Sequence, residues 1–182
     1  MITLDLQGLN KARIWFEPNS KLLIEKHSKN AFYKFESSHS NECQDRTIIL
    51  ELFLPRGARI IYGVLGINYK YMADKLLTIK VPATNNDLKM FDDSLIAPLE
   101  KANIGLPLDY GKEIFLELAR LHKVNKLLLT GEIDFCYAVH SEASSSSWIF
   151  QKLTYILINL SLIPRDIVNR ETLIELLELS RS

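Results

Sequence analysis

Residues 131–150, which read GEIDFCYAVHSEASSSSWIF, bring together the side-chain types that hydrolases use. His140 could act as a general base for Ser145 or Cys136. Glu142 could be the carboxylate that orients the imidazole. A direct Cys136–His140 pair is disfavoured, because four residues of strand separate the Cα atoms by roughly 13 Å, whereas a working pair approaches to about 3 Å. A small hydrolase is therefore a secondary hypothesis, and we assign no catalytic residue.

The same stretch contains half of the zinc-deaminase signature, H-x-E, at His140-Ser141-Glu142. The other half, P-C-x-x-C, is absent, and a chain with 2 cysteines cannot supply the site. Neither H-E-x-x-H nor the phosphate-binding patterns G-x-x-x-x-G-K-[ST] and G-x-G-x-x-G occur. We therefore expect no metal, no cofactor and no nucleotide-hydrolysing activity.

The serine run at 144–147 precedes an apolar stretch that begins at Trp148. Ser144 or Ser145 can accept hydrogen bonds from the free amide groups at the start of a helix, so capping is the first interpretation. A free helix N-terminus can also bind an anion. His140, Ser144 and Ser145 are thus candidate contacts for an anion or a partner.

Lysines lie beside aromatic residues at Lys34 and again at Lys70 and Tyr71. Such rings can stack on nucleic-acid bases while lysines hold the phosphate backbone. The simpler interpretation is a strand with one buried face. Lys34, Lys70 and Tyr71 complete the candidate partner contacts.

The charge balance argues against binding driven by phosphates. Lys plus Arg number 22, as do Asp plus Glu, whereas tight nucleic-acid binding depends on excess cationic side chains. No DNA-binding motif is present. The most apolar stretch, 148–163, contains Gln151 and Lys152 and is shorter than the roughly 20 residues that span a bilayer. Without a signal-peptide pattern at 1–20, we expect a cytoplasmic protein with no membrane partner.

The first half of the chain predicts strands, because apolar and polar residues alternate or β-branched residues cluster. A Pro-Arg-Gly turn between two such runs favours a hairpin. The predicted strands lie at 2–6, 12–16, 31–36, 47–54, 58–65 and 76–81.

The second half predicts a helix from about 107, with Glu117 on its polar side, a strand at 131–140, and a helix at 145–162. A last helix is expected near 170–180, with Asn169 as its N-cap. The strand alternates, with Ile133, Phe135, Tyr137 and Val139 on one face and Asp134, Cys136, Ala138 and His140 on the other.

The order of these elements predicts an α+β fold, a largely antiparallel sheet with helices packed on one face. We expect residues 1–90 to supply most of the sheet, 94–162 to form a helix–strand–helix layer and 165–182 to form a C-terminal helix. The whole is expected to be one compact unit.

Two motifs within residues 104–157 resemble the fourth domain of translation elongation factor G. Pro107-Leu108-Asp109-Tyr110 is similar to that family's Pro-x-Glu-Tyr helix start. EASSSSWIF, from Glu142 to Phe150, is similar to a stretch of the form H-E-V-D-S-S-E-M-A-F that opens a second helix. The resemblance implies the fold of a small-subunit ribosomal protein's second domain, in which helices cover one side of a four-stranded sheet. The family's Gly- and Arg-rich loop has no counterpart here.

These observations predict a non-enzymatic binding protein with an unknown macromolecular partner. RNA or the ribosome is the partner that the resemblance implies. A protein partner, as for an inhibitor or an immunity-type protein, suits the neutral charge equally well.

Overall fold

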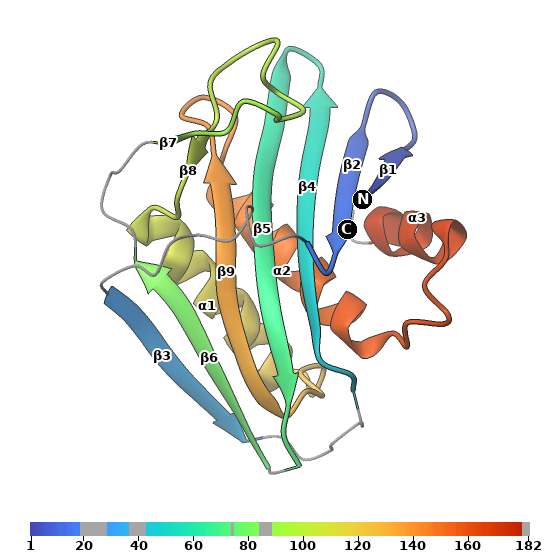
Figure 1. Cartoon of the computed structure of the whole chain (residues 1–182). Helices are drawn as coiled ribbons and strands as arrows, with labels where there is room; N and C mark the ends of the chain where they lie inside the picture. The colour runs from blue at the N-terminus through green and yellow to red at the C-terminus, as the bar shows by residue number, and fades with distance from the viewer. Residues whose placement is uncertain (19–28, 37–42, 74, 84–88, 180–182) are drawn as a thin grey trace.

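Nine strands and three helices make up the described part of the chain, residues 1–18, 29–36, 43–73, 75–83 and 89–179 of a computed structural model (Figure 1). The strands are β1 (Ile2–Asp5), β2 (Lys11–Phe16), β3 (Lys29–Glu36), β4 (Arg46–Arg56), β5 (Arg59–Tyr71), β6 (Leu76–Ala83), β7 (Lys89–Met90), β8 (Asn103–Ile104) and β9 (Gly131–His140). The helices are α1 (Leu108–Lys123), α2 (Ser147–Leu162) and α3 (Arg170–Leu179). The predicted α+β class is confirmed.

One sheet runs in the order β1-β2-β4-β5-β9-β6-β3, and β7 and β8 join it at the end of β9. Every pair of neighbours is antiparallel except β6 and β9, which are parallel. Viewed with both of these strands pointing up, β6 lies to the left of β9 and α1 passes behind the sheet (Figure 1). This is a left-handed crossover, the opposite of the usual hand.

The predicted hairpin is formed by β4 and β5, which pair from Arg56–Arg59 up to Arg46–Tyr69. Gly57 has φ 61°, a left-handed conformation that glycine adopts without steric cost, so the strands can reverse within two residues. These two long, paired strands lie in the middle of the sheet.

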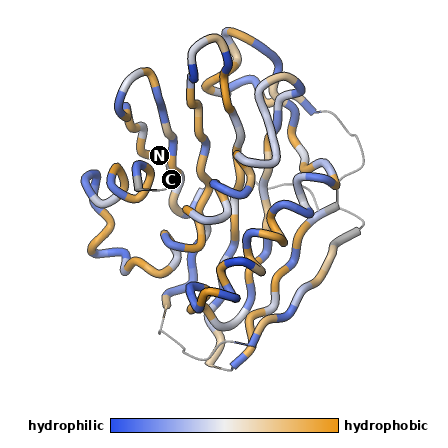
Figure 2. Tube along the Cα trace, turned by 180° about the vertical axis from the view of Figure 1, so that it is seen from behind, coloured by the Kyte–Doolittle hydropathy of each residue, from blue (hydrophilic) through white to orange (hydrophobic). Residues whose placement is uncertain are grey.

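The helices cover one face of the sheet, which Figure 2 shows from the helical side. The apolar face of α2 is fully buried as predicted, at Ile149, Leu153, Ile156, Leu157 and Leu160. Gly63 of β5 allows this close approach, because a Cβ there would lie 3.1 Å from Leu153 Cδ1 and 3.2 Å from Ile149 Cγ2. The close packing of α2 on the sheet therefore depends on having glycine, which has no Cβ, at position 63.

The other two helices differ in how well they match the sequence. In α1 the prediction for Glu117 is wrong: its side chain is buried and pairs with Arg120 at 2.6 Å. In α3 the predicted cap is confirmed, since the amide of Thr172 donates to Asn169 Oδ1 at 2.9 Å. Residues 180–182 of the expected last helix lie outside the described residues. No described helix has the length and apolar character to cross a bilayer.

A β-bulge interrupts β9 and corrects the predicted alternation. Gly66 of β5 pairs with Tyr137, but the next residue, Ile67, pairs with Phe135, which leaves Cys136 as the extra residue. Phe135 thus packs in the core under the helices, whereas Tyr137 packs in a second cluster on the opposite face. The bulge therefore exchanges the faces to which the side chains in the second half of β9 point.

The face without helices has two parts. Its upper part is covered by the segment 89–104, which buries a small second cluster that includes Tyr62, Val64, Ile96 and Tyr137. Its lower part, which we call the charged band, carries two cross-strand rows. One row is Lys70, Glu132, Thr78 and Lys34, and the other is Asn68, Asp134, Lys80 and Phe32.

Candidate functional site

The turn that follows β9 is locked by its own hydroxyl groups. Ser141 is fully buried, and its Oγ donates to the carboxylate of Glu100 and accepts from the amide of Ser144 at 3.2 Å. Ser145 Oγ accepts from the amide of Ser141 at 2.9 Å and donates to the carbonyl of Tyr62 at 2.8 Å. These bonds fix the turn against the end of the β4–β5 hairpin.

The helix after this turn begins where the serines predict, but they do not cap it. The N-cap of α2 is Ser146, and within the described residues the helix has no side-chain capping hydrogen bond at this end. The capping prediction for Ser144 and Ser145 is therefore wrong. The reason is competition: the Ser145 hydroxyl is already bonded within the turn, and Ser144 is buried there.

The candidate hydrolase residues do not form a catalytic arrangement in the structure. His140 Nδ1 is 3.0 Å from the carbonyl oxygen of Gly105, and its ring lies 6.2 Å from that of Tyr110 on α1. Among the described residues, no hydrogen bond joins His140 to Ser145, Glu142 or Cys136. His140 and Ser145 are each held by a different part of the chain.

The thiol of Cys136 is poorly suited to nucleophilic chemistry. Burial raises its pKa to about 12, and the nearby carboxylate of Asp134 adds to the rise. Catalytic thiols have the opposite shift, because the thiolate is the reactive form. The raised pKa therefore disfavours the thiolate that a nucleophilic Cys136 would need.

A cleft that the sequence did not reveal lies beside the serine turn. It has a volume of about 510 Å³ and opens between the β7–β8 pair and the residues that follow β9. Its lining residues are Met90, Glu100, Lys101, Asn103, Glu142 and Ala143. Only Glu142 was singled out from the sequence, because the other residues come from segments with no recognisable motif.

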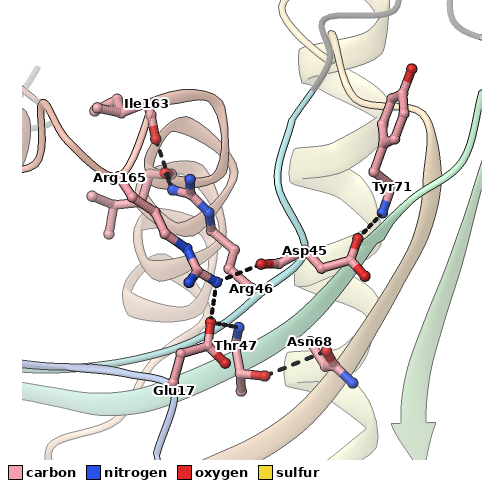
Figure 3. A network of polar contacts seen from close by, with 9 residues as sticks. Glu17, Asp45, Arg46, Thr47, Asn68, Tyr71, Ile163 and Arg165 are labelled. Carbon is pink, nitrogen blue, oxygen red and sulfur yellow. Dashed lines mark hydrogen bonds and ion pairs between the residues drawn. The ribbon is translucent and has the colours of Figure 1, made fainter.

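The lysine and tyrosine candidates separate onto opposite faces. Lys70 and Lys34 are exposed and occupy the ends of one row of the charged band, about 14 Å apart across three strand spacings. Tyr71 packs against the core under the helices, and its amide donates to Asp45 Oδ1 at 2.8 Å (Figure 3). The structure thus places two of these three residues on one exposed face and packs Tyr71 on the other.

A buried carboxylate on the face without helices was also missed. Glu51 of β4 is fully buried and accepts hydrogen bonds from Tyr62 Oη at 3.0 Å and from the amide of Leu95 at 2.7 Å. Arg13 lies 3.5 Å from its other oxygen and also donates to the carbonyl of Asp93 at 2.7 Å. Burial raises the pKa of Glu51 despite these partners. The available signal was a single carboxylate inside the apolar run TIILELFL.

Two arginines lie where the start of β4 meets the end of α2 (Figure 3). Arg46 is only 4% exposed and donates through Nη1 to the carbonyls of Leu160 and Ile163, both at 2.8 Å. Arg165 binds Glu17 at 2.6 Å on the surface. Since free carbonyls at a helix C-terminus attract cations, Arg46 serves as a buried cap, and this network is structural.

Comparison with known proteins found no matching family model, no matching curated protein and no matching solved structure. Within the described ranges, no group of three or more His, Cys, Asp or Glu side chains is placed to hold a metal ion. The function therefore has to be argued from the surfaces of this chain.

Proposed function

We propose that this chain is a cytoplasmic binding protein whose partner, another protein, docks on the charged band. One observation carries the proposal: Phe32 on β3 is 64% exposed on the side of the sheet that carries no helix. Aromatic side chains of this size supply much of the binding energy when a partner buries them. Phe32 is thus the anchor that we expect a partner to cover.

The charges around Phe32 favour a protein over a nucleic acid. The band holds three lysines and two carboxylates, and Lys80 pairs with Asp134 at 3.0 Å. Tight binding to a phosphate backbone needs a clear excess of positive charge. Protein interfaces instead match charges of both signs around a buried anchor. A role as an inhibitor or immunity-type protein is consistent with such a surface.

RNA or the ribosome is the second candidate, and one feature favours it. The helices α1 and α2 lie on one face of the sheet with β9 between them in sequence, as the resemblance to elongation factor G implies. An exposed ring between lysines could then stack on a base. The salt dependence of binding separates the two candidates, because phosphate contacts lose affinity steeply as salt rises.

The test compares the immobilised wild-type chain with Phe32→Arg and with Leu116→Arg, whose leucine is exposed on α1 and so provides a matched control. We expect one protein from native lysate to be retained by the wild type and by Leu116→Arg, but not by Phe32→Arg. Retention should survive nuclease treatment, and the purified partner should reproduce it. Equal retention by Phe32→Arg would contradict the proposal, and release by nuclease would favour RNA.

A further inference from the structure

The cleft between the β7–β8 pair and the serine turn is lined by a side-chain amide that makes no hydrogen bond within the described part of the chain. Asn103 is 8% exposed, it lines the cleft, and its side chain makes no hydrogen bond with any described residue. The atoms of this amide are not among the fully buried side-chain atoms that lack a partner in the described residues, so they remain accessible from the cleft. An unpartnered amide that faces an open cleft is placed to bind a ligand.

The register of the strands fixes which way this amide points. Asn103 pairs with Met90 on one side and with His140 on the other, so the three side chains share one face. The ring of His140 contacts Tyr110 of α1, which places that face on the helical side of the sheet. The Asn103 amide therefore points away from the face that carries the charged band.

Two carboxylates reach the cleft from separate segments. Glu100 precedes β8 and is held by the hydroxyl of Ser141, which is itself fixed by the amide of Ser144. Glu142 projects from the turn after β9 and is exposed. Lys101 is the single cation among the described lining residues, which therefore carry one net negative charge.

The available groups match the donors of a guanidinium. Glu100, Glu142 and the Asn103 Oδ1 atom are acceptors, and a guanidinium presents several N–H donors in one plane. Charge-assisted bonds of this kind are about twice as strong as neutral ones. The thioether of Met90, half-exposed at the edge of the cleft, provides a polarisable surface for an aliphatic stem.

We propose that this cleft binds a guanidinium group on an aliphatic stem, as presented by an arginine side chain of a partner protein. Free arginine carries the same group and is the other source of it. This site does not depend on the charged band, so failure of one proposal leaves the other intact.

The test follows the Asn103 side-chain amide by nitrogen–proton NMR while N-acetyl-L-arginine methylamide is added to the whole chain. We expect its two cross-peaks to shift in a saturable way, with a dissociation constant of about 1 mM. The matching citrulline compound, which has the same shape without the charge, should produce no saturable shift. Free L-arginine that binds much more tightly than the blocked compound would identify a free small molecule as the source.

Three variants test the lining directly. Glu100→Gln and Glu142→Gln should each weaken binding about tenfold, the equivalent of one lost charge-assisted hydrogen bond. Lys101→Ala should strengthen it about threefold, because a repulsive charge is removed. Chemical shifts far from the cleft report whether each variant is folded. Unmoved Asn103 peaks, equal binding of the citrulline compound, saturable binding of inorganic phosphate, or weaker binding by Lys101→Ala would each overturn the proposal.

Discussion

Replacing Arg46 with methionine should destabilise the protein far more than replacing its neighbour Arg165 with alanine. Arg46 is buried and donates to two carbonyls at the end of α2, at 2.8 Å each. Each hydrogen bond from a charged donor contributes about 1.5–3 kcal/mol. Removing the buried charge returns part of that loss, because its desolvation cost disappears as well.

We expect a net loss of about 3 kcal/mol in the free energy of unfolding for Arg46→Met. For a chain of this size, that corresponds to a drop of about 10 °C in Tm. The side chains of Arg165 and Glu17 are 49% and 50% exposed, so the control Arg165→Ala should cost less than about 1 kcal/mol. Urea unfolding followed by circular dichroism measures both values, and thermal melts give the two Tm shifts.

Similar losses in the two variants, or a loss below about 1 kcal/mol for Arg46→Met, would refute the reasoning. Either result would mean that the carbonyls of Leu160 and Ile163 find other donors. The burial of Arg46 would then not determine how much this residue contributes to the free energy of unfolding.

Two further predictions concern the sheet. Gly63→Ala should cost about 1–3 kcal/mol of unfolding free energy because the new Cβ crowds α2. Gly111→Ala inside α1, where the nearest atom would lie 3.7 Å from the new Cβ, should instead stabilise the protein by up to about 1 kcal/mol. Urea titrations measure both changes in unfolding free energy, and changes of the same sign would contradict the packing described for α2. Because burial raises the pKa of Glu51, the wild type should lose stability as pH rises from the ordinary glutamate pKa through the raised one. Glu51→Gln should lack this loss, so unfolding curves across that pH window should increasingly favour the variant, and a constant difference would refute the shift.

Local patterns predicted the parts of the fold that local chemistry controls. The β4–β5 hairpin follows from two β-rich runs around a glycine turn, and the burial of α2 follows from its wide apolar face. The cap at Asn169 likewise depends on one side chain and an amide three residues away. Each of these features is decided within a few residues of sequence.

Features that depend on distant contacts could not be predicted in this way. The bulge at Cys136 adds one residue to a regular alternation, and only the pairing with β5 shows it. The serines after β9 have the composition of a helix cap, but the carbonyl of Tyr62 competes for the hydroxyl of Ser145. Glu117 was placed on the polar side of its helix because the sequence does not show how far the core extends around α1.

The candidate sites follow the same division. The turn at Ser144 and Ser145 was located correctly as the joint between a strand and a helix, although its hydrogen bonds differ from those expected. Lys34 and Lys70 share a face only because β9 and β6 lie between their strands. Asn103 was not predicted at all, since an isolated asparagine gives no signal until its partners are known.

The position of β9 has a consequence for the order in which the chain can assemble. β5 ends at Tyr71 and β6 begins at Leu76, yet β9, which starts at Gly131, lies between them. During synthesis, the β3–β6 pair therefore lacks its neighbour in the sheet until residues 131–140 have left the ribosome. Closing such long loops slows folding and leaves strand edges open to wrong pairing. Refolding of the purified chain should thus be slow for its size, and fragments that end before Gly131 should aggregate.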